Sequence, residues 1–347
     1  MLVYIVLAVI IVPPLLVTLI GRAIAAPKYE GKVSNHFDGK KFFNPSGKNS
    51  KGLLDAVKWQ REKREKGVWN KADDFQYSPK PTPSVLGDDL RVTYIGHSTV
   101  LLQFDGLNIL TDPVWYERCS PVQWAGPKRA IPAGIRMDDL PKIDLILQSH
   151  NHWDHLDIIN LPKIWKRDKP LIITTLGIGK FLNKKGIDTV VDMDWWDVHQ
   201  YTEGVKITCV PAQHFSGRGT SDRNATLWAG FVISSKIGNI YFAGDSGYGH
   251  FFDQIGAKFG KMRLALIPIG AFKPRWFMGN IHCSPEEAVQ IHFDVQAECS
   301  LAIHHSTFPL ADDGQTEPID LLKEAKILRG VAEDAFFVLK EGEFKNV

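Results

Sequence analysis

The central part of the chain alternates between short apolar runs and turn-forming residues. Runs rich in β-branched and aromatic residues predict strands, and the first three cover residues 92–95, 100–104 and 107–110. The second and third runs are joined by Asp105-Gly106, a dipeptide that favours a two-residue hairpin turn. A folded domain is therefore predicted to begin near Arg91 with antiparallel strands.

Apolar runs and amphipathic segments then alternate to the end of the chain. The runs predict strands at residues 143–147, 171–175, 205–210, 227–233, 240–243, 264–269, 301–303 and 336–339. Helices are predicted at residues 177–185, 251–259 and 321–328, and another begins at Ser284 with a capping box. We expect a turn at Gly238-Asn239 to pair two of the strands. The pattern predicts two sheets packed face to face, with helices covering the outside.

The first 25 residues have a different pattern, an uncharged apolar run over residues 2–20. This run is long enough to span a membrane, and Pro13-Pro14 predicts a kink within it. A cleaved signal peptide is the alternative, because residues 23–25 resemble a cleavage site. No basic residue precedes the run, however, and the run is longer than the apolar part of a typical signal peptide. We therefore favour an N-terminal apolar helix that anchors the chain.

The charges beside this run predict on which side of a membrane the folded domain lies. The nearest positive charges follow the run, at Arg22, Lys28 and Lys32. Because positive charges stay on the cytoplasmic side, the anchor interpretation places the domain in the cytoplasm. A signal peptide would place it in the periplasm.

Residues 26–90 are predicted to form an extension of the main domain, which covers residues 91–347. The extension is rich in Lys, Gly, Pro and Asn, with one helix predicted at residues 52–66. Its aromatic segment is expected to fix the extension to the core through Phe37, Phe42 and Phe43. We favour this over a catalytic role because His36 and Asp38 have no ligand-type residues beside them in the sequence.

The composition is that of a globular protein. The chain has 347 residues, of which 44% are hydrophobic, enough for a large core. Its net charge of +2 gives no basic field for a nucleic-acid partner. The four cysteines are scattered without a Cys-x-x-Cys pair, which argues against a disulfide framework or a thiolate zinc site.

Ligand-type residues are concentrated directly after the strand predicted at residues 143–147. Three histidines and an aspartate lie within six residues: His150, His152, Asp154 and His155. Imidazole and carboxylate suit Zn²⁺ and other first-row divalent ions. One ion can take His150 and His152, and a second can take Asp154 and His155. A polar loop of exposed histidines is the alternative, but such density is rare without a metal.

Three further candidates each follow a predicted strand: His214, Asp245 and His304. Taken singly, each is more typical of a hydrogen-bonded structural residue. Together with the cluster they supply seven ligands, enough for two Zn²⁺ that share a bridging carboxylate. Two ions about 3.5–4 Å apart can bind both a water-derived nucleophile and an anionic substrate.

Several longer motifs resemble one branch of the metallo-β-lactamase superfamily. They are residues 150–155, 211–214, 222–228, 242–248, 267–278 and 285–288. The branch is the N-acyl-phosphatidylethanolamine-hydrolysing phospholipase D family with its bacterial relatives, and the resemblance runs from about Asn35 to the C-terminus. It implies a four-layer αβ/βα sandwich with two zinc ions at one edge of the sheets.

The resemblance also implies a role for each site residue. One zinc would be held by His150, His152 and His214, and the other by Asp154, His155 and His304, with Asp245 bridging. Asp112 falls beside the metals, where it is expected to orient the nucleophile. His282 falls near the reacting phosphate, where it is expected to stabilise the developing charge or to protonate the leaving oxygen. His305 departs from the tryptophan of animal members, which bears on lipid specificity.

The long loop at residues 114–141 carries Trp115, Tyr116 and Trp124, and loops of this length inside a domain are usually functional. We expect these aromatic side chains to form an apolar floor for substrate, although an ordinary packed loop is the alternative. With the anchor, they favour a membrane phospholipid, above all N-acyl-phosphatidylethanolamine.

Other functions stay open on the sequence alone. A sugar-phosphate lactonase or another hydrolase of the same fold is the main alternative, followed by a nuclease. A redox diiron centre is disfavoured because Asn151 stands where such sites favour a carboxylate. A membrane protein that binds metal without turnover is the alternative from another class, and a homodimer stays open.

Overall fold

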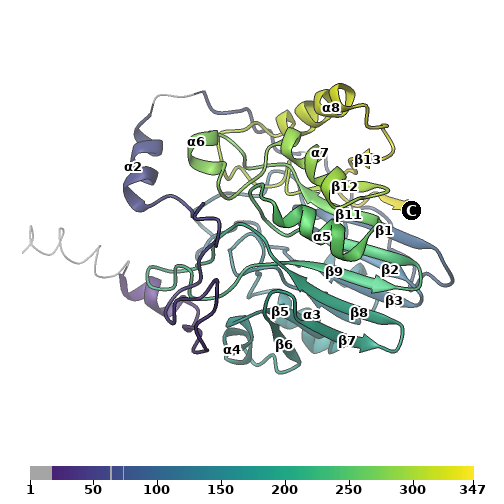
Figure 1. The fold of residues 1–347 in the computed structure, drawn as a ribbon, viewed down its shortest axis with the longest axis horizontal. Coiled ribbons are helices and arrows are strands. Elements are labelled where there is room, and N and C mark those ends of the chain that lie inside the picture. Colours follow the sequence, from purple (N-terminus) through teal and green to yellow (C-terminus); the bar gives the residue numbers. More distant parts are fainter. Residues whose placement is uncertain (1–17, 63–64, 73) are drawn as a thin grey trace, which may run out of the picture.

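The computed structural model describes residues 18–62, 65–72 and 74–347. Within these residues, two seven-stranded sheets lie face to face (Figure 1). The first sheet has the order β14-β1-β2-β3-β4-β5-β6. Its strands are β1 (Leu90–Gly96), β2 (Thr99–Phe104), β3 (Leu107–Thr111), β4 (Leu145–Leu147), β5 (Leu171–Thr175), β6 (Val190–Met193) and β14 (Phe344–Asn346).

The second sheet has the order β13-β12-β11-β10-β9-β8-β7. Its strands are β7 (Val198–Thr202), β8 (Val205–Val210), β9 (Gly230–Ser235), β10 (Gly238–Phe242), β11 (Met262–Pro268), β12 (Ser300–Ile303) and β13 (Phe336–Phe337). Both sheets are mixed, since each combines antiparallel hairpins with parallel pairs. Each sheet therefore contains both the hairpins and the alternation of strands with helices that the sequence predicts.

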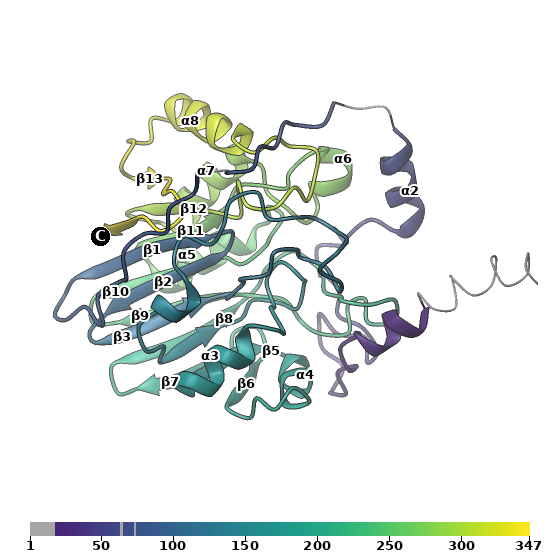
Figure 2. The ribbon, with the colours of Figure 1, turned by 180° about the vertical axis from the view of Figure 1, so that it is seen from behind.

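Alternation along the strands creates four layers. In β2, Val100, Leu102 and Phe104 point into the core between the sheets, whereas Leu101 points to the outer face. The outer face of the first sheet is covered by α3 (Leu161–Asp168) and α4 (Ile178–Asn183), as seen from behind in Figure 2. The second sheet is covered by α5 (Phe251–Phe259), α7 (Pro285–Asp294) and α8 (Glu317–Arg329). The predicted sandwich with outer helices is confirmed.

Several local predictions are confirmed, but the helix predicted at residues 52–66 ends at Arg61 and one predicted turn lies elsewhere. The helix predicted at residues 251–259 has those bounds, and Ser284 forms its capping box with Glu287. The turn predicted at Gly238-Asn239 lies two residues earlier, because β9 ends at Ser235 and β10 already begins at Gly238. The sequence analysis missed the short or exposed elements α3, α6 (Arg275–Met278), η1 (Met137–Asp139), β6, β7 and β14.

The predicted anchor lies mostly outside the described residues, which begin at Thr18. Residues 18–23 are helical, and just after them the backbone N–H of Ala26 donates to Asp222 Oδ2 at 2.8 Å. None of the helices in the described part of the chain combines the length and apolar character needed to cross a membrane. The N-terminal apolar helix therefore stays a prediction.

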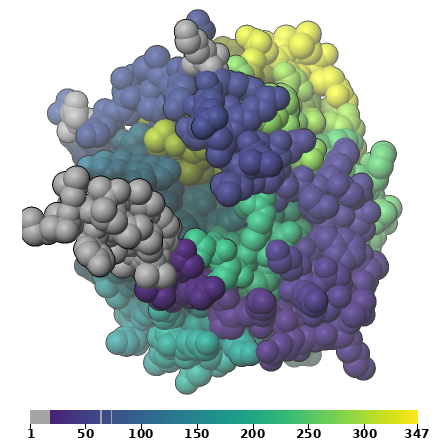
Figure 3. Space-filling model, turned by 90° about the vertical axis from the view of Figure 1, so that its left-hand side faces the viewer, coloured from purple at the N-terminus to yellow at the C-terminus, as the bar shows by residue number. Residues whose placement is uncertain are grey.

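The extension lies across one edge of the sandwich. Phe37 and Phe42 are buried against Leu227 and Trp228 of the core. Further on, α2 (Leu53–Arg61) stands beside α6 at the left of Figure 1. Figure 3 looks onto this edge, where the extension frames a surface that is hollowed near its centre.

Candidate metal centre

The structure brings all seven predicted ligands together at one edge of the sandwich. They follow four strands: β4, β8, β10 and β12. In the first sheet β4 runs parallel to β3 and β5, and in the second sheet β10 runs parallel to β11 and β12. Strands with a common direction end at the same edge, so residues far apart in sequence meet there.

One group of ligands consists of His150, His152 and His214. His152 Nδ1 lies 2.8 Å from His150 Nε2 and 3.2 Å from His214 Nε2. His150 and His214 are buried and His152 is half-buried, and burial lowers the pKa of His214 to about 4. Neutral imidazoles with converging nitrogens are the form that binds a metal.

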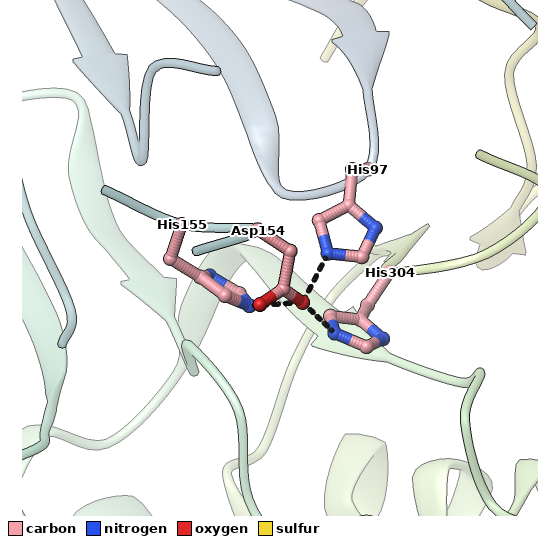
Figure 4. Close-up of side chains that lie close together, drawn as sticks. All are labelled: His97, Asp154, His155 and His304. Atoms are coloured by element: carbon pink, nitrogen blue, oxygen red, sulfur yellow. Dashed lines mark hydrogen bonds and ion pairs between the residues drawn. The ribbon is translucent and has the colours of Figure 1, made fainter. Parts of the chain in front are cut away.

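A second group consists of Asp154, His155 and His304. Asp154 Oδ2 lies 3.4 Å from His155 Nε2 and 3.5 Å from His304 Nε2, as Figure 4 shows. His97, which the sequence analysis missed, adds a third imidazole to this carboxylate. Its signal in the sequence is the one used for the others, a histidine directly after a predicted strand.

Asp245 lies between the two groups. Its Oδ2 is 3.1 Å from both His155 Nε2 and His304 Nε2, and 3.7 Å from His214 Nε2. Burial alone would raise the pKa of Asp245, but the neighbouring imidazoles outweigh it and hold that pKa well below its usual range. An ionised carboxylate that reaches both groups is suited to bridge two cations.

Hydrogen bonds behind the ligands fix the orientation of their rings. His155 Nδ1 lies 2.6 Å from Asp112 Oδ2, and His214 Nδ1 donates to the carbonyl of Ile281 at 2.8 Å. Ser149 Oγ donates to Asp112 Oδ2 at 2.5 Å and lies 2.9 Å from His150 Nδ1. Partners of this kind select the tautomer and strengthen a ligand.

These contacts also define the position of Asp112. Both of its carboxylate oxygens bind the protein, since Oδ1 accepts from the backbone N–H of Ser149 at 2.7 Å and from Gln148 Nε2 at 3.0 Å. The side chain is fully buried behind the ligands. This geometry suits a residue that orients His155. It does not suit the predicted role of orienting the nucleophile, because both carboxylate oxygens already bind the protein.

The residues present fit divalent cations. Several buried ligand atoms at this point have no hydrogen-bond partner in the described structure, among them His152 Nε2, His155 Nε2, His304 Nε2 and Asp245 Oδ1. The same holds for Nδ1 of the neighbouring His282. Unsatisfied buried polar atoms are costly, and their clustering calls for a partner at the centre. Imidazole and carboxylate together favour zinc and related first-row ions.

A cleft of about 310 Å³ opens beside the ligands. Its polar wall includes His282, whose Nδ1 is 3.9 Å from Asp245 Oδ2. Its apolar wall comes from residues that the sequence analysis did not assign to the site: Trp153, Phe215, Phe277, Met278, Ile281 and Leu310. The cleft therefore joins a metal-binding floor to apolar sides.

The residues predicted to bind substrate lie elsewhere. Trp115 donates its indole N–H to the carbonyl of Ile135, and Tyr116 is buried with its hydroxyl accepting from the N–H of Ile158. Trp124 is 81% exposed. These three side chains do not line the cleft, although Cys119 of the aromatic loop (residues 114–141) does. Tyr116 packs behind the cleft wall, with its ring centroid 6.4 Å from that of Trp153.

His305 also faces away from the cleft. It is buried, stacks on Tyr94 with ring centroids 5.3 Å apart, and places Nδ1 3.0 Å from Ser306 Oγ. Burial lowers its pKa to about 4, so the ring is neutral. The side chain is thus part of the packing behind His304.

A buried arginine holds the metal loop (residues 148–157). Arg218 Nη1 donates to the carbonyls of Asn151 and Leu156 at 2.8 and 2.9 Å. Its guanidinium lies 3.7 Å from the ring centroid of Trp153. Because one rigid side chain binds both ends of the ligand cluster, it fixes the backbone from which the ligands project.

Comparisons with known protein families and with individual proteins agree on the family to which this chain is similar. The model of the beta-lactamase superfamily domain matches residues 107–305. The chain is 38% identical over 336 residues to N-acyl-phosphatidylethanolamine-hydrolyzing phospholipase D 1 of Caenorhabditis elegans, which covers 91% of this chain and 93% of that protein.

Two further proteins extend the comparison. The mitochondrial N-acyl-phosphatidylethanolamine-hydrolyzing phospholipase D of Saccharomyces cerevisiae is 36% identical over 237 residues, or 67% of this chain and 50% of that protein. Among solved structures, the metallo hydrolase Igni18 of Ignicoccus hospitalis superposes with a TM-score of 0.57 at 23% identity, over 75% of this chain and 98% of that one. The last comparison concerns the fold alone.

Proposed function

This chain belongs to the beta-lactamase superfamily and, within it, to the family of N-acyl-phosphatidylethanolamine-hydrolysing phospholipases D, and from that premise we propose that it hydrolyses a membrane phosphodiester. It is a metal-dependent hydrolase. The proposed substrate is N-acyl-phosphatidylethanolamine or a related phospholipid, cleaved on the phospholipase D side of the phosphate. The observation that carries this proposal is the pair of ligand groups at the floor of a cleft with apolar walls.

The ligand set suits an anionic substrate. Two divalent ions, proposed to be Zn²⁺, would lower the pKa of water and neutralise phosphoryl oxygens. Asp245 contacts ligands of both groups, so it is suited to keep the two halves of the site together. His282 borders the cleft next to Asp245. We propose that it gives a proton to the leaving alcohol oxygen as the phosphorus–oxygen bond breaks.

The surface around the cleft supports a substrate that stays in a lipid layer. Trp59 of α2 stacks on Phe277 of the cleft wall, with centroids 4.8 Å apart. On the same helix Leu53 and Leu54 are 80% and 84% exposed, and Lys58, one turn after Leu54, lies 4.0 Å from the carboxylate of Glu62. Apolar side chains flanked by basic ones are typical of a helix that rests on an anionic membrane surface.

The test uses purified protein and a panel of phospholipids, with hydrolysis in ¹⁸O-water followed by mass spectrometry. We expect N-acylethanolamine and phosphatidic acid, with the label in the phosphatidic acid because solvent oxygen attacks phosphorus. Label in the released alcohol would contradict this mechanism. Activity on a sugar lactone with no turnover of any lipid would contradict the substrate class.

Membrane anchoring by residues 1–25 is a separate proposal that rests on the apolar run. We expect the full chain to stay in the membrane fraction when salt is raised, since a hydrophobic anchor is insensitive to screening. Recovery of a soluble chain that starts near Ala26 would instead show a cleaved signal peptide.

A further inference from the structure

We propose that His97 is a positioning residue of the metal centre, which orients Asp154 through its imidazole and His304 through its backbone carbonyl. The proposal rests on the metal centre of the proposed function and is independent of the substrate. His97 lies in the turn between β1 and β2, outside all the motifs that single out the other ligands.

The side chain of His97 holds one oxygen of Asp154. His97 Nε2 is 3.0 Å from Asp154 Oδ2, closer than the nitrogens of His155 and His304 that meet the same oxygen (Figure 4). The ionised carboxylate is an acceptor, so the Nε2–H of His97 donates. A monodentate carboxylate ligand can rotate about its own bonds, and a hydrogen bond of this kind restricts that rotation.

The backbone of His97 holds a second ligand from the opposite sheet. The N–H of His304 donates to the carbonyl of His97 at 2.8 Å, and the N–H of His97 donates to Thr307 Oγ1 at 2.9 Å. Both partners belong to the segment that follows β12. The turn after β1 is therefore bound directly to the segment that supplies His304.

The backbone conformation of the turn indicates that the surrounding structure holds His97 in place. His97 has a φ of 57°, in the left-handed region that residues other than glycine rarely adopt. The residue is buried, and its ring packs against Phe308 with centroids 5.3 Å apart. A strained residue that stays buried between two sheets is held by its surroundings, and such strain is concentrated at functional sites.

His97 differs from the ligands in the carboxylates that it contacts. His155 and His304 each contact both Asp154 and Asp245. Among the described residues, His97 has an ion pair with Asp154 but none within 4.0 Å of Asp245. It therefore lies on the outer side of Asp154, where it supports a ligand instead of completing the ring of donors around the bridging carboxylate.

The experiment compares His97→Ala and His97→Gln with His292→Gln as a matched control. His292 is also buried and lies 2.8 Å from Ser300 Oγ, away from the ligands. Metal-free protein is titrated with Zn²⁺ against a competing chelator, and the visible spectrum of the Co²⁺-loaded protein is recorded. Near-ultraviolet circular dichroism of the metal-free variants reports whether they are folded.

We expect His97→Ala to weaken one of two bound ions by about 10–100-fold, the usual effect of losing a hydrogen-bond partner of a ligand, and to leave the other ion unchanged. The Gln side chain retains an N–H donor, so His97→Gln should recover most of the affinity and keep the wild-type Co²⁺ spectrum. The control variant should match the wild type in both measurements.

Two results would overturn the proposal. Wild-type affinity for both ions in His97→Ala would show that the contact with Asp154 has no positioning role. A changed Co²⁺ spectrum in a folded His97→Gln variant would show that His97 is itself a ligand. If His97→Ala does not fold, His97→Gly replaces it in the affinity measurement, because glycine also removes the imidazole and tolerates the φ of 57°. No substrate is used, so a wild-type protein that binds two ions without cleaving lipids would count against the proposed function only.

Discussion

The metal loop and the aromatic loop follow neighbouring parallel strands, β4 and β3, yet they direct their side chains differently. The metal loop places imidazoles and a carboxylate at the cleft, whereas the aromatic loop buries Tyr116 and exposes Trp124. A buried arginine holds each loop. Arg218 binds two carbonyls of the metal loop, and Arg129 binds the carbonyls of Val114 and Tyr116 in the aromatic loop.

This comparison shows which kind of sequence signal locates a site. Ligand-type residues at close spacing have few stable arrangements without a metal, because each buried polar atom needs a partner. Aromatic side chains have many stable arrangements, because any apolar surface accommodates them. The spacing of the ligands therefore located the cleft, whereas aromatic composition pointed to a loop whose aromatic side chains do not line it.

The largest expected effect comes from the residue that joins the two groups of ligands. Asp245→Ala should lower metal affinity by more than ~100-fold, beyond the loss typical for a partner of a ligand, and should abolish activity. The chain should stay folded, because a buried carboxylate among imidazoles is removed without loss of apolar packing. Metal content by mass spectrometry and circular dichroism check both points.

Asp168→Ala is the matched control for this change. Asp168 is a carboxylate with little exposure in α3, and it accepts from the N–H of Ile143 at 2.9 Å. We expect a loss of stability with normal metal content. Full metal occupancy in Asp245→Ala would contradict the bridging position.

The two buried arginines allow the loops to be compared directly. Arg218→Met and Arg129→Met each remove the donors of two buried carbonyls, which should cost about 2–5 kcal/mol of unfolding free energy in either case. Only Arg218→Met should also weaken metal binding, because only that loop carries ligands. Chemical unfolding with and without chelator separates the two effects. Equal losses of metal affinity would show that the aromatic loop also shapes the metal centre.

Much of the fold follows from the apolar pattern. Three elements have the predicted bounds: the strands at residues 171–175 and 205–210 and the helix at residues 251–259. In each of them the pattern of apolar residues is compatible with one kind of element. The edge strand β7 was missed because it is mostly exposed and reads as a polar segment. The three-residue β14 was missed because its pairing with β1 depends on contacts remote in sequence.

The candidate site likewise contains residues that the sequence predicts and residues that it does not. Residues within one short stretch, such as His150 and Asp154, could be grouped from the sequence alone. His97 has the same signal as His214 and His304, a histidine after a predicted strand, but its contact with Asp154 exists only once β1 and β4 take their places in the sheet. Phe215 and Phe277 meet in the cleft wall because the segment after β8 is joined to the segment after α6, through the hydrogen bond of His214 to the carbonyl of Ile281, which no local pattern predicts.

Glu341, which lies near the arginine that holds the aromatic loop, should make the stability of the metal-free protein depend on pH. Burial raises the pKa of Glu341, near Arg129, to about 7 from an ordinary value of 4.5. Its contribution to stability is therefore fully present below about pH 4.5 and is lost as the pH rises through about 7. Glu341→Gln should remove this loss, on the order of 1 kcal/mol, when unfolding is measured at pH 5 and pH 8. An unchanged pH dependence would show that Glu341 does not titrate there.

The smallest expected effect separates the two candidate surfaces for lipid. Phe277 lines the cleft, so Phe277→Ala should raise the KM for a long-chain phospholipid several-fold and change that for a short, water-soluble phosphodiester little. The reason is that only the long-chain substrate uses apolar contact area, at about 25 cal/mol per Å². Trp124 is 81% exposed and does not line the cleft, so Trp124→Ala should stay within about twofold of the wild type on both substrates. Kinetics of both variants on both substrates check this. A selective loss of long-chain hydrolysis in Trp124→Ala would restore the aromatic loop as a lipid contact, because an exposed tryptophan can act on lipid at the membrane surface without touching the cleft.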